Sequence, residues 1–130
     1  MDLSKEIEIA KNVRKNAYAP YTKYYVGTAL KASSGKIYSG CNIENIGVLS
    51  VCSERVAFVK AISEGEKKFE YIVVCGGSTL DKLDPTLPCG YCRQFMSEFV
   101  DENFKIYALS ENDNITEYSM EDLLPHGFNF

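Results

Sequence analysis

The sequence predicts an α/β fold, a three-layer α/β/α sandwich built around one mixed sheet of about five strands. Two strand-like segments open the pattern, and strands and helices then alternate through the rest of the chain. Residues 71–75, YIVVC, are apolar without interruption, which is typical of a strand covered on both faces. A chain of 130 residues suits one domain with one buried core, so we expect a single domain over residues 1–130.

Each element has its own signal in the chain. Apolar residues recur at helical spacing before Pro20, which ends the first helix. The Ser33-Ser34-Gly35 turn separates the two runs of an opening hairpin. Residues 53–64 are apolar almost all round, as expected of a buried helix. The predicted elements are, in chain order, helix 3–17, strands 24–31 and 36–43, helix 53–64, strand 71–75, helix 90–100, strand 104–109, strand 115–118 and helix 120–124.

Charge and cysteine usage exclude several classes of function. The net charge is −4 and Lys and Arg form no run, so a basic face for a nucleic acid is not expected. Because no apolar run reaches membrane-spanning length and no signal-peptide core follows the first residues, we expect a cytoplasmic protein. Thiols stay reduced in that compartment, and the five cysteines therefore indicate metal ligands and core residues rather than disulfides.

Two short motifs carry the chemistry, CSER at residues 52–55 and PCGYCRQ at residues 88–94. Cys89 and Cys92 have the C-x-x-C spacing with which two thiolates hold one metal ion, and Cys52 offers a third ligand. Three protein ligands leave a fourth tetrahedral position open, which distinguishes catalytic from structural zinc sites. A water at that position would be acidified, and we expect one Zn²⁺ per chain.

Glu54 and two arginines complete the predicted centre. Both thiol groups fall where helices are expected to begin, and the positive end of a helix stabilises thiolates. Arg55 and Arg93 could hydrogen-bond the sulfurs and offset their charge further. Residues two apart do not share a helix face. Cys52 and Glu54 can therefore address one water only if Cys52 starts its helix and the metal lies off the helix end.

Other interpretations of these residues stay open. A closed structural Cys₄ site would take Cys41 or Cys75 as its fourth ligand, although buried free cysteine is common in strands. A non-catalytic zinc-binding module would use the pocket only to bind a ligand. Loss of the carboxylate would be the sign of such a module, and Glu54 is present. The only histidine, His126, is expected to be a loop residue.

Five motifs, in order, resemble those of the small, homotetrameric cytidine deaminases. Residues 19–27, APYTKYYVG, are similar to the family's A-P-Y-S-x-F-x-V-G, and residues 40–45 match its G-C-N-I-E-N outright. The two cysteine motifs resemble C-A-E-R and P-C-G-A-C-R-Q, and residues 123–125 with Phe128 resemble the closing E-L-L-P-x-x-F. The resemblance covers nearly the whole chain.

The resemblance implies zinc-dependent hydrolysis of cytidine and 2′-deoxycytidine to uridine and 2′-deoxyuridine with release of ammonia, a step of pyrimidine salvage. It implies that Cys52, Cys89 and Cys92 bind the zinc and that Glu54 moves protons. The partners it implies are a small-molecule nucleoside and identical subunits, in a homotetramer whose sites borrow residues across interfaces, with no nucleic acid and no membrane.

Substrate contacts are implied at five further positions. Asn42 and Glu44 would hydrogen-bond the ribose, chiefly its 3′-hydroxyl, and their spacing of two places both side chains on one side of an extended segment. Tyr24 would pack near the base or sugar, and Ser53 lies at the start of the Cys52 helix, whose amides could help to bind the base. Phe128 would reach a neighbouring subunit's site.

The chain also departs from the family pattern. Tyr91 replaces a small residue between the paired cysteines, Ser53 and Val56 replace Ala and Thr, and Leu87 stands where Ser is usual. The stretch from residue 42 to residue 52 is one residue shorter than usual and lacks its tyrosine, in a loop that shapes the substrate pocket. Blasticidin S deaminases use the same chemistry but lack the full ribose motif, so the sequence favours the plain nucleoside.

Overall fold

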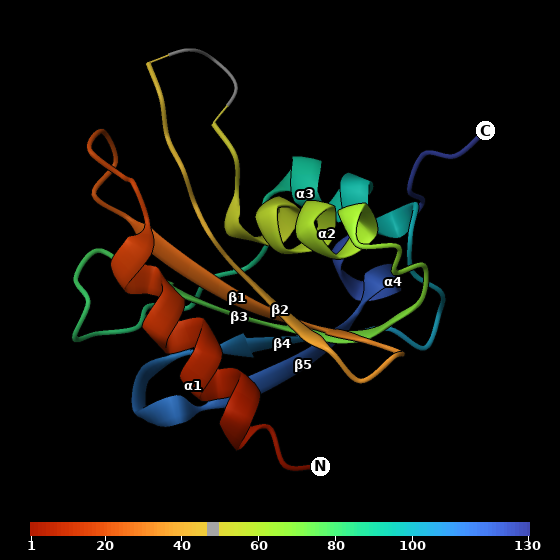
Figure 1. The fold of residues 1–130 in the computed structure, drawn as a ribbon, viewed down its shortest axis with the longest axis horizontal. Coiled ribbons are helices and arrows are strands. Elements are labelled where there is room, and N and C mark those ends of the chain that lie inside the picture. The colour runs from red at the N-terminus through yellow and green to blue at the C-terminus, as the bar shows by residue number, and fades with distance from the viewer. Residues whose placement is uncertain (47–49) are drawn as a thin grey trace.

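Five strands form one mixed sheet with helices against both of its faces (Figure 1). The computed structural model describes residues 1–46 and 50–130. In spatial order β2-β1-β3-β4-β5, β3 and β4 pair in parallel and the other neighbours pair antiparallel. The strands are β1 (Tyr25–Ala32), β2 (Ile37–Cys41), β3 (Phe69–Gly77), β4 (Lys105–Leu109) and β5 (Ile115–Ser119).

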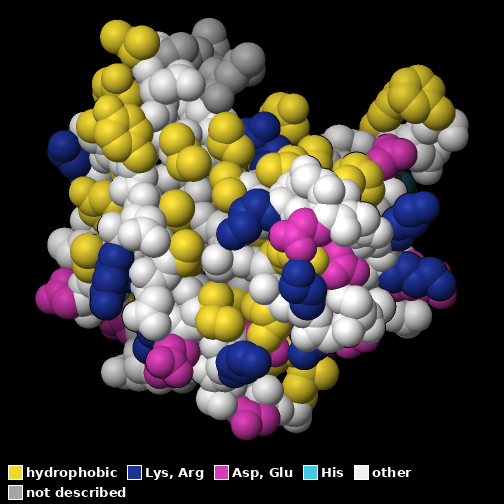
Figure 2. All heavy atoms as spheres, viewed as in Figure 1, with side chains coloured by type: hydrophobic (Ala, Val, Ile, Leu, Met, Phe, Trp, Pro, Cys, Tyr) yellow, Lys and Arg dark blue, Asp and Glu magenta, His cyan; other side chains and the backbone are white. Residues whose placement is uncertain are grey.

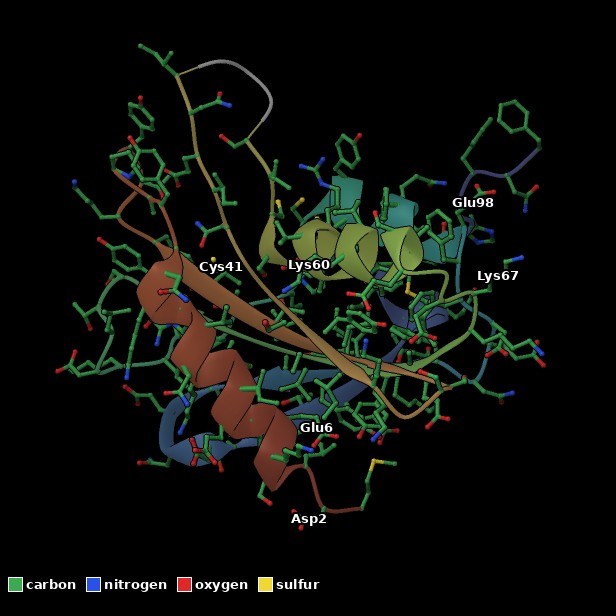
Figure 3. The ribbon with its side chains drawn as sticks, in the orientation of Figure 1. Asp2, Glu6, Cys41, Lys60, Lys67 and Glu98 are labelled. Atoms are coloured by element: carbon green, nitrogen blue, oxygen red, sulfur yellow. The ribbon has the colours of Figure 1, made fainter. Side chains whose placement is uncertain are left out.

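The helices divide between the two faces of the sheet. One face is covered by α1 (Ser4–Val13), and the other by α2 (Ser53–Ser63) and α3 (Gly90–Ser97) with the short α4 (Met120–Leu123). Figure 3 shows Glu6 of α1 and Lys60 of α2 on opposite sides of the sheet. The predicted three-layer sandwich around a mixed sheet is therefore confirmed.

The central strand β3 explains why two cores form. Ile72 and Val74 belong to the cluster under α2 and α3, whereas Val73 and Cys75 belong to the cluster under α1. All four side chains are almost completely buried, since successive residues of a strand point to opposite faces. The prediction of a strand covered on both faces is confirmed.

Several element ends differ from the predicted ones, each for a local reason. The first helix ends at Val13 and continues as a 3₁₀ turn, Arg14–Asn16. β2 stops at Cys41, and Ile43 makes only isolated bridges beyond it. α3 stops at Ser97 because its last amides bond three residues back, as Phe99 N does to Met96 O at 2.9 Å.

The sheet directs the starts of α2 and α3 to one edge. β2 and β3 are both antiparallel to β1, so they run in the same direction and end at the same edge, and each leads into one of the two helices. Gly40 permits the close contact between β2 and α2. A Cβ there would lie 2.3 Å from the carbonyl oxygen of Ser53 and 2.7 Å from the amide nitrogen of Ala57.

Arg14 joins α1 to the same edge of the sheet. Its buried side chain donates from Nε to the carbonyl of Tyr25 at 2.8 Å, and from Nη2 to the carbonyls of Gly77 and Thr79 at 3.1 and 2.7 Å. These bonds fix the start of β1 and the end of β3 against one another. The chain that leads into β1 and the loop that follows β3 therefore leave the sheet from a rigid base.

Within residues 1–46 and 50–130, no helix combines the length and the apolar character needed to cross a bilayer.

Candidate metal and active site

Three cysteine sulfurs meet where α2 and α3 begin. Cys52 is the N-cap residue of α2, Cys89 is the N-cap residue of α3, and Cys92 lies in the first turn of α3. Their ligand atoms lie within 4.8 Å of one another, and the sulfurs of Cys52 and Cys89 are 3.5 Å apart. Sulfurs on a tetrahedral zinc at about 2.3 Å are about 3.8 Å apart, so the donor set fits this metal.

The cluster favours the thiolate form that a metal requires. A hydrogen bond from Cys92, with further ones from Cys89 and Arg55, lowers the pKa of the Cys52 thiol to about 5 although burial opposes it. The hydrogen bond to Cys52 and burial together raise the pKa of Cys92. The amides at the two helix starts add positive potential to this charge distribution.

The arginine beside this cluster is Arg55. Burial lowers the pKa of the guanidinium, but the neighbouring Cys92 and Cys52 thiols outweigh it and raise this pKa above its ordinary value. Nη2 donates to the carbonyl of Ser50 at 2.7 Å, while Nε is buried and has no partner among the residues that the structure describes. A buried N–H next to the thiols is a further feature that fits a thiolate-bound metal.

Arg93 does not have the position expected from the sequence. Its Nε donates to the carbonyl of Pro88 at 2.7 Å and its Nη1 to the carbonyl of Leu123 at 2.9 Å. The guanidinium thus ties the turn before Cys89 to α4 instead of bonding a sulfur. The reason is that each residue of a helix is turned by about 100° from the one before it, so the residue after Cys92 is directed towards α4.

Glu54 is buried in the first turn of α2, with 3% of its surface exposed. Ser53 Oγ donates to its carboxylate, and the 2.7 Å contact between the Ser53 and Thr28 hydroxyls is then donated by Thr28, since Ser53 has only one hydroxyl proton. Burial raises the pKa of Glu54, partly offset by the bond from Ser53. The carboxylate is therefore held in one orientation, and burial makes it bind a proton more readily than an exposed glutamate does.

A cavity of about 280 Å³ joins this carboxylate to the thiols. Its lining confirms that Cys52 and Glu54 reach one space from the start of α2, the condition that the sequence could state but not test. The cavity is also lined by Cys89, Asn42, Tyr24 and Ser53. Cys92 is buried and is not among the lining residues. The remaining lining residues, which the sequence argument did not select as site residues, are Thr22, Val26, Thr86 and Leu87.

Asn42 lines this cavity, whereas Glu44 does not line it and instead supports Thr22, which does. Asn42 accepts from Val26 N at 2.9 Å and donates to the carbonyl of Tyr24 at 2.8 Å. Glu44 accepts from the amides of Tyr21 and Thr22 at 3.1 and 3.2 Å, and from the Thr22 hydroxyl. Burial alone would raise the pKa of Glu44, but these hydrogen bonds hold it below the ordinary value.

The opposite wall is fixed by a contact between distant segments. The Tyr24 hydroxyl lies 2.6 Å from the Thr86 hydroxyl, and Thr86 donates to the carbonyl of Asp84 at 3.0 Å. The phenolic oxygen of Tyr24 is the only sequence signal for this contact, because the family pattern usually has Phe there. Part of the loop expected over residues 46–51 lies outside the described residues, since 47–49 are not described.

The remaining predicted residues lie elsewhere. Cys41 and Cys75 are buried, and burial raises the pKa of both thiols, that of Cys75 to about 11. Neither belongs to the group of possible metal ligands found among the described residues. Figure 3 shows Cys41 on β2, away from α3. Phe128 is outside the cavity of its own chain and 64% exposed. His126 is in the loop after α4.

Comparisons with known proteins agree with the site. The model of the cytidine and deoxycytidylate deaminase zinc-binding region matches residues 2–108, which include the three cysteines and Glu54. The cytidine deaminase of Sporosarcina psychrophila is 41% identical over 129 residues, 98% of this chain and 92% of that protein. A blasticidin-S deaminase of Bacillus cereus is 32% identical over 108 residues, 79% of this chain and 76% of its own. The crystal structure of the cytidine deaminase from Burkholderia pseudomallei aligns with a TM-score of 0.88 at 37% identity, over 98% of this chain and 100% of that one.

The first prediction concerns the metal. We expect the purified protein to contain one zinc per chain and Cys89→Ser to lose it, because two remaining sulfurs cannot hold zinc tightly. Cys41→Ser and Cys75→Ser serve as matched controls and should keep the metal. Elemental analysis gives the zinc content, and zinc loss in either control variant would indicate a closed Cys₄ site instead.

Proposed function

The chain belongs to the cytidine deaminase family, and on that premise we propose that it hydrolyses cytidine and 2′-deoxycytidine to the uridine nucleosides and ammonia. The observation that carries the proposal is the position of Glu54. A buried carboxylate with a raised pKa lines the same cavity as Cys52 and Cys89. The reduced thiols that the site needs agree with the expected cytoplasmic location.

The chain's own residues would divide the reaction as follows. Cys52, Cys89 and Cys92 would hold the zinc, which when bound supplies a Lewis acid that lowers the pKa of a water. Glu54 accepts a proton from the attacking water as its oxygen bonds to C4 of the cytosine ring. The carboxyl group gives this proton to N3. It then takes the remaining proton of the new C4 hydroxyl and passes it to the amino group, so that the C4–N4 bond breaks, C4 becomes a carbonyl and ammonia is released.

Ser53 and Thr28 prepare Glu54 for this double role. Their hydroxyls form a donor chain that ends on the carboxylate, so its orientation stays fixed while its proton comes and goes. Burial favours the protonated carboxyl and the Ser53 bond favours the carboxylate, which keeps both forms accessible. A group that must be base and then acid benefits from this balance.

The sugar would be recognised by hydrogen bonds at the side of the cavity that Asn42 and Glu44 support. The Asn42 amide carries two N–H donors, and its bond to the Tyr24 carbonyl needs one of them. The side chain lines the cavity, so a second N–H is available for a hydroxyl. Glu44 supports the same wall through residues 21 and 22 and offers a carboxylate acceptor. Tyr24, held by Thr86, would lie beside the base or sugar.

We expect Glu54→Gln to bind zinc and fold normally but to lose about 10²–10⁴-fold in kcat, because the amide keeps the shape and cannot carry the proton. The assay is the ultraviolet change with cytidine, 2′-deoxycytidine, cytosine, CMP and blasticidin S. Glu8→Gln, an exposed glutamate of α1, is the control and should match the wild type. Near-normal turnover by Glu54→Gln would refute the mechanism, and a preference for blasticidin S would overturn the assignment of the substrate.

The sugar contacts give a second kinetic prediction. 3′-Deoxycytidine should be a poor substrate while 2′-deoxycytidine stays good, because a polar group left unpaired costs about 1–3 kcal/mol. The measurement is kcat/KM for cytidine and the two deoxy compounds. Equal efficiency on all three would remove ribose recognition by Asn42 and Glu44 from the proposal.

The active form would be a homotetramer. Phe128 is 64% exposed and Phe130 is fully exposed, and their rings meet edge to face with their centroids 5.1 Å apart. In Figure 2, hydrophobic side chains project from the molecule where the chain ends. An apolar groove beside this tail is lined by Tyr91 and Phe95 of α3 and by Phe99, two residues beyond the end of that helix. Exposed aromatics of this kind are explained if another subunit covers them, which supports a closed, symmetric assembly in which Phe128 reaches a neighbour's site.

Removal of residues 127–130 should leave zinc bound but raise KM and lower kcat, since the neighbouring site would stay open to water. Leu80→Ala, which removes an exposed apolar side chain from the loop after β3, is the control and should change neither value. Light scattering reports the assembly state and steady-state kinetics report the site. A fully active monomer, or unchanged kinetics in the truncated chain, would contradict the tetramer.

A further inference from the structure

Tyr91 makes an unexpected contact at the metal site. It lies between the paired cysteines and belongs to the first turn of α3. Although the residue is 62% exposed, its ring is stacked on the guanidinium of Arg55, with Cζ 4.2 Å from the ring centroid. This distance is well within the range of a cation–π interaction.

Arg55 has contacts on its other sides as well. Nη2 is bound to the carbonyl of Ser50, and the side chain shares a face of α2 with Cys52, three residues earlier, whose thiol together with that of Cys92 raises the pKa of the guanidinium. The guanidinium therefore lies between an aromatic ring and the thiol cluster. Because Tyr91 is on α3 and Arg55 is on α2, the stack also bridges the two helices that supply the cysteines.

We propose that Tyr91 is a positioning residue that holds the Arg55 guanidinium against the thiolates and thereby slows the loss of zinc. The proposal rests on the proposed zinc site but not on the identity of the substrate. Three thiolates and one Zn²⁺ leave a net charge of −1, and the cationic guanidinium offsets it. Water competes for the same guanidinium, and the ring removes water from one of its faces.

A small residue at position 91 would leave the arginine less constrained. The bond to Ser50 would still hold one nitrogen, so the guanidinium would not leave the site. It would spend part of its time turned towards solvent, and the sulfurs would then lose a hydrogen-bond donor. Since Tyr91 is mostly exposed, its removal leaves no void in the core and should not affect folding.

The test measures the rate at which zinc passes from the protein to a coloured chelator, 4-(2-pyridylazo)resorcinol, with no nucleoside present. Tyr91→Ala should release zinc about three- to tenfold faster, as expected for loss of one partly exposed cation–π contact. Tyr91→Phe keeps the ring and should match the wild type, whereas Tyr91→Leu keeps bulk without the ring and should resemble Tyr91→Ala. Tyr18→Ala, which removes another exposed tyrosine, is the control.

A double-mutant cycle separates positioning from a general effect on structure. In the Arg55→Gln background, Tyr91→Ala should change zinc release by less than about twofold, because the contact has already been removed. An undiminished effect in that background, a wild-type rate for Tyr91→Ala, or equal damage from Tyr91→Phe would each overturn the proposal. Light scattering on every variant shows whether assembly has changed, and faster release only in variants with altered assembly would overturn it too.

The outcome is independent of the test of the proposed function. A protein that binds zinc but does not deaminate nucleosides would refute the proposed function, while the release rates would still decide the role of Tyr91. Wild-type protein without zinc would overturn both.

Discussion

The structure depends on the meeting of two helix starts at one edge of the sheet. Cys52 and Cys89 cap these helices, and the parallel course of β2 and β3 brings them to the same edge. The absence of a side chain at Gly40 lets α2 approach β2 closely enough for this meeting. A site built from helix starts gains positive potential and free amides without any added residue. Thiolate charge at this edge is therefore stabilised, whereas it would be costly on an isolated loop.

The same geometry solves the problem of placing a base beside the metal ligands. Inside a helix, residues 52 and 54 would face different directions, but at its first turn the cap sulfur and the Glu54 carboxylate both reach the end of the helix. Burial makes the carboxylate hold a proton more readily, and Ser53 limits that tendency. Burial is thus the largest influence on the proton affinity of Glu54, and the Ser53 hydroxyl and the neighbouring Cys52 adjust it further.

Much of this was predictable because local patterns determine it. The apolar run of residues 71–75 and the amphipathic helices follow from periodicity, and the ligand set follows from cysteine spacing. The contacts that were missed join segments far apart in the chain. Tyr24 meets Thr86 across 62 positions, and Arg93 bonds the carbonyl of Leu123 instead of a sulfur. Hydrogen bonds to backbone carbonyls have no sequence signature, since every residue offers one.

The sequence motif that contains Glu44 indicates which side of the segment this residue faces. Glu44 also has a structural role that the motif does not indicate. The spacing of Asn42 and Glu44 places both on one side of the segment, as expected, but their nearest partners are the chain before β1. These polar side chains take the place of strand pairing, which ends at Cys41. Asn42 and Glu44 support the cavity wall even when no ligand is bound. A substitution at either position would therefore disturb the shape of the cavity as well as any contact with a sugar. Nucleosides altered at one hydroxyl probe the contact without disturbing the wall, and they separate these two roles where mutation of the protein cannot.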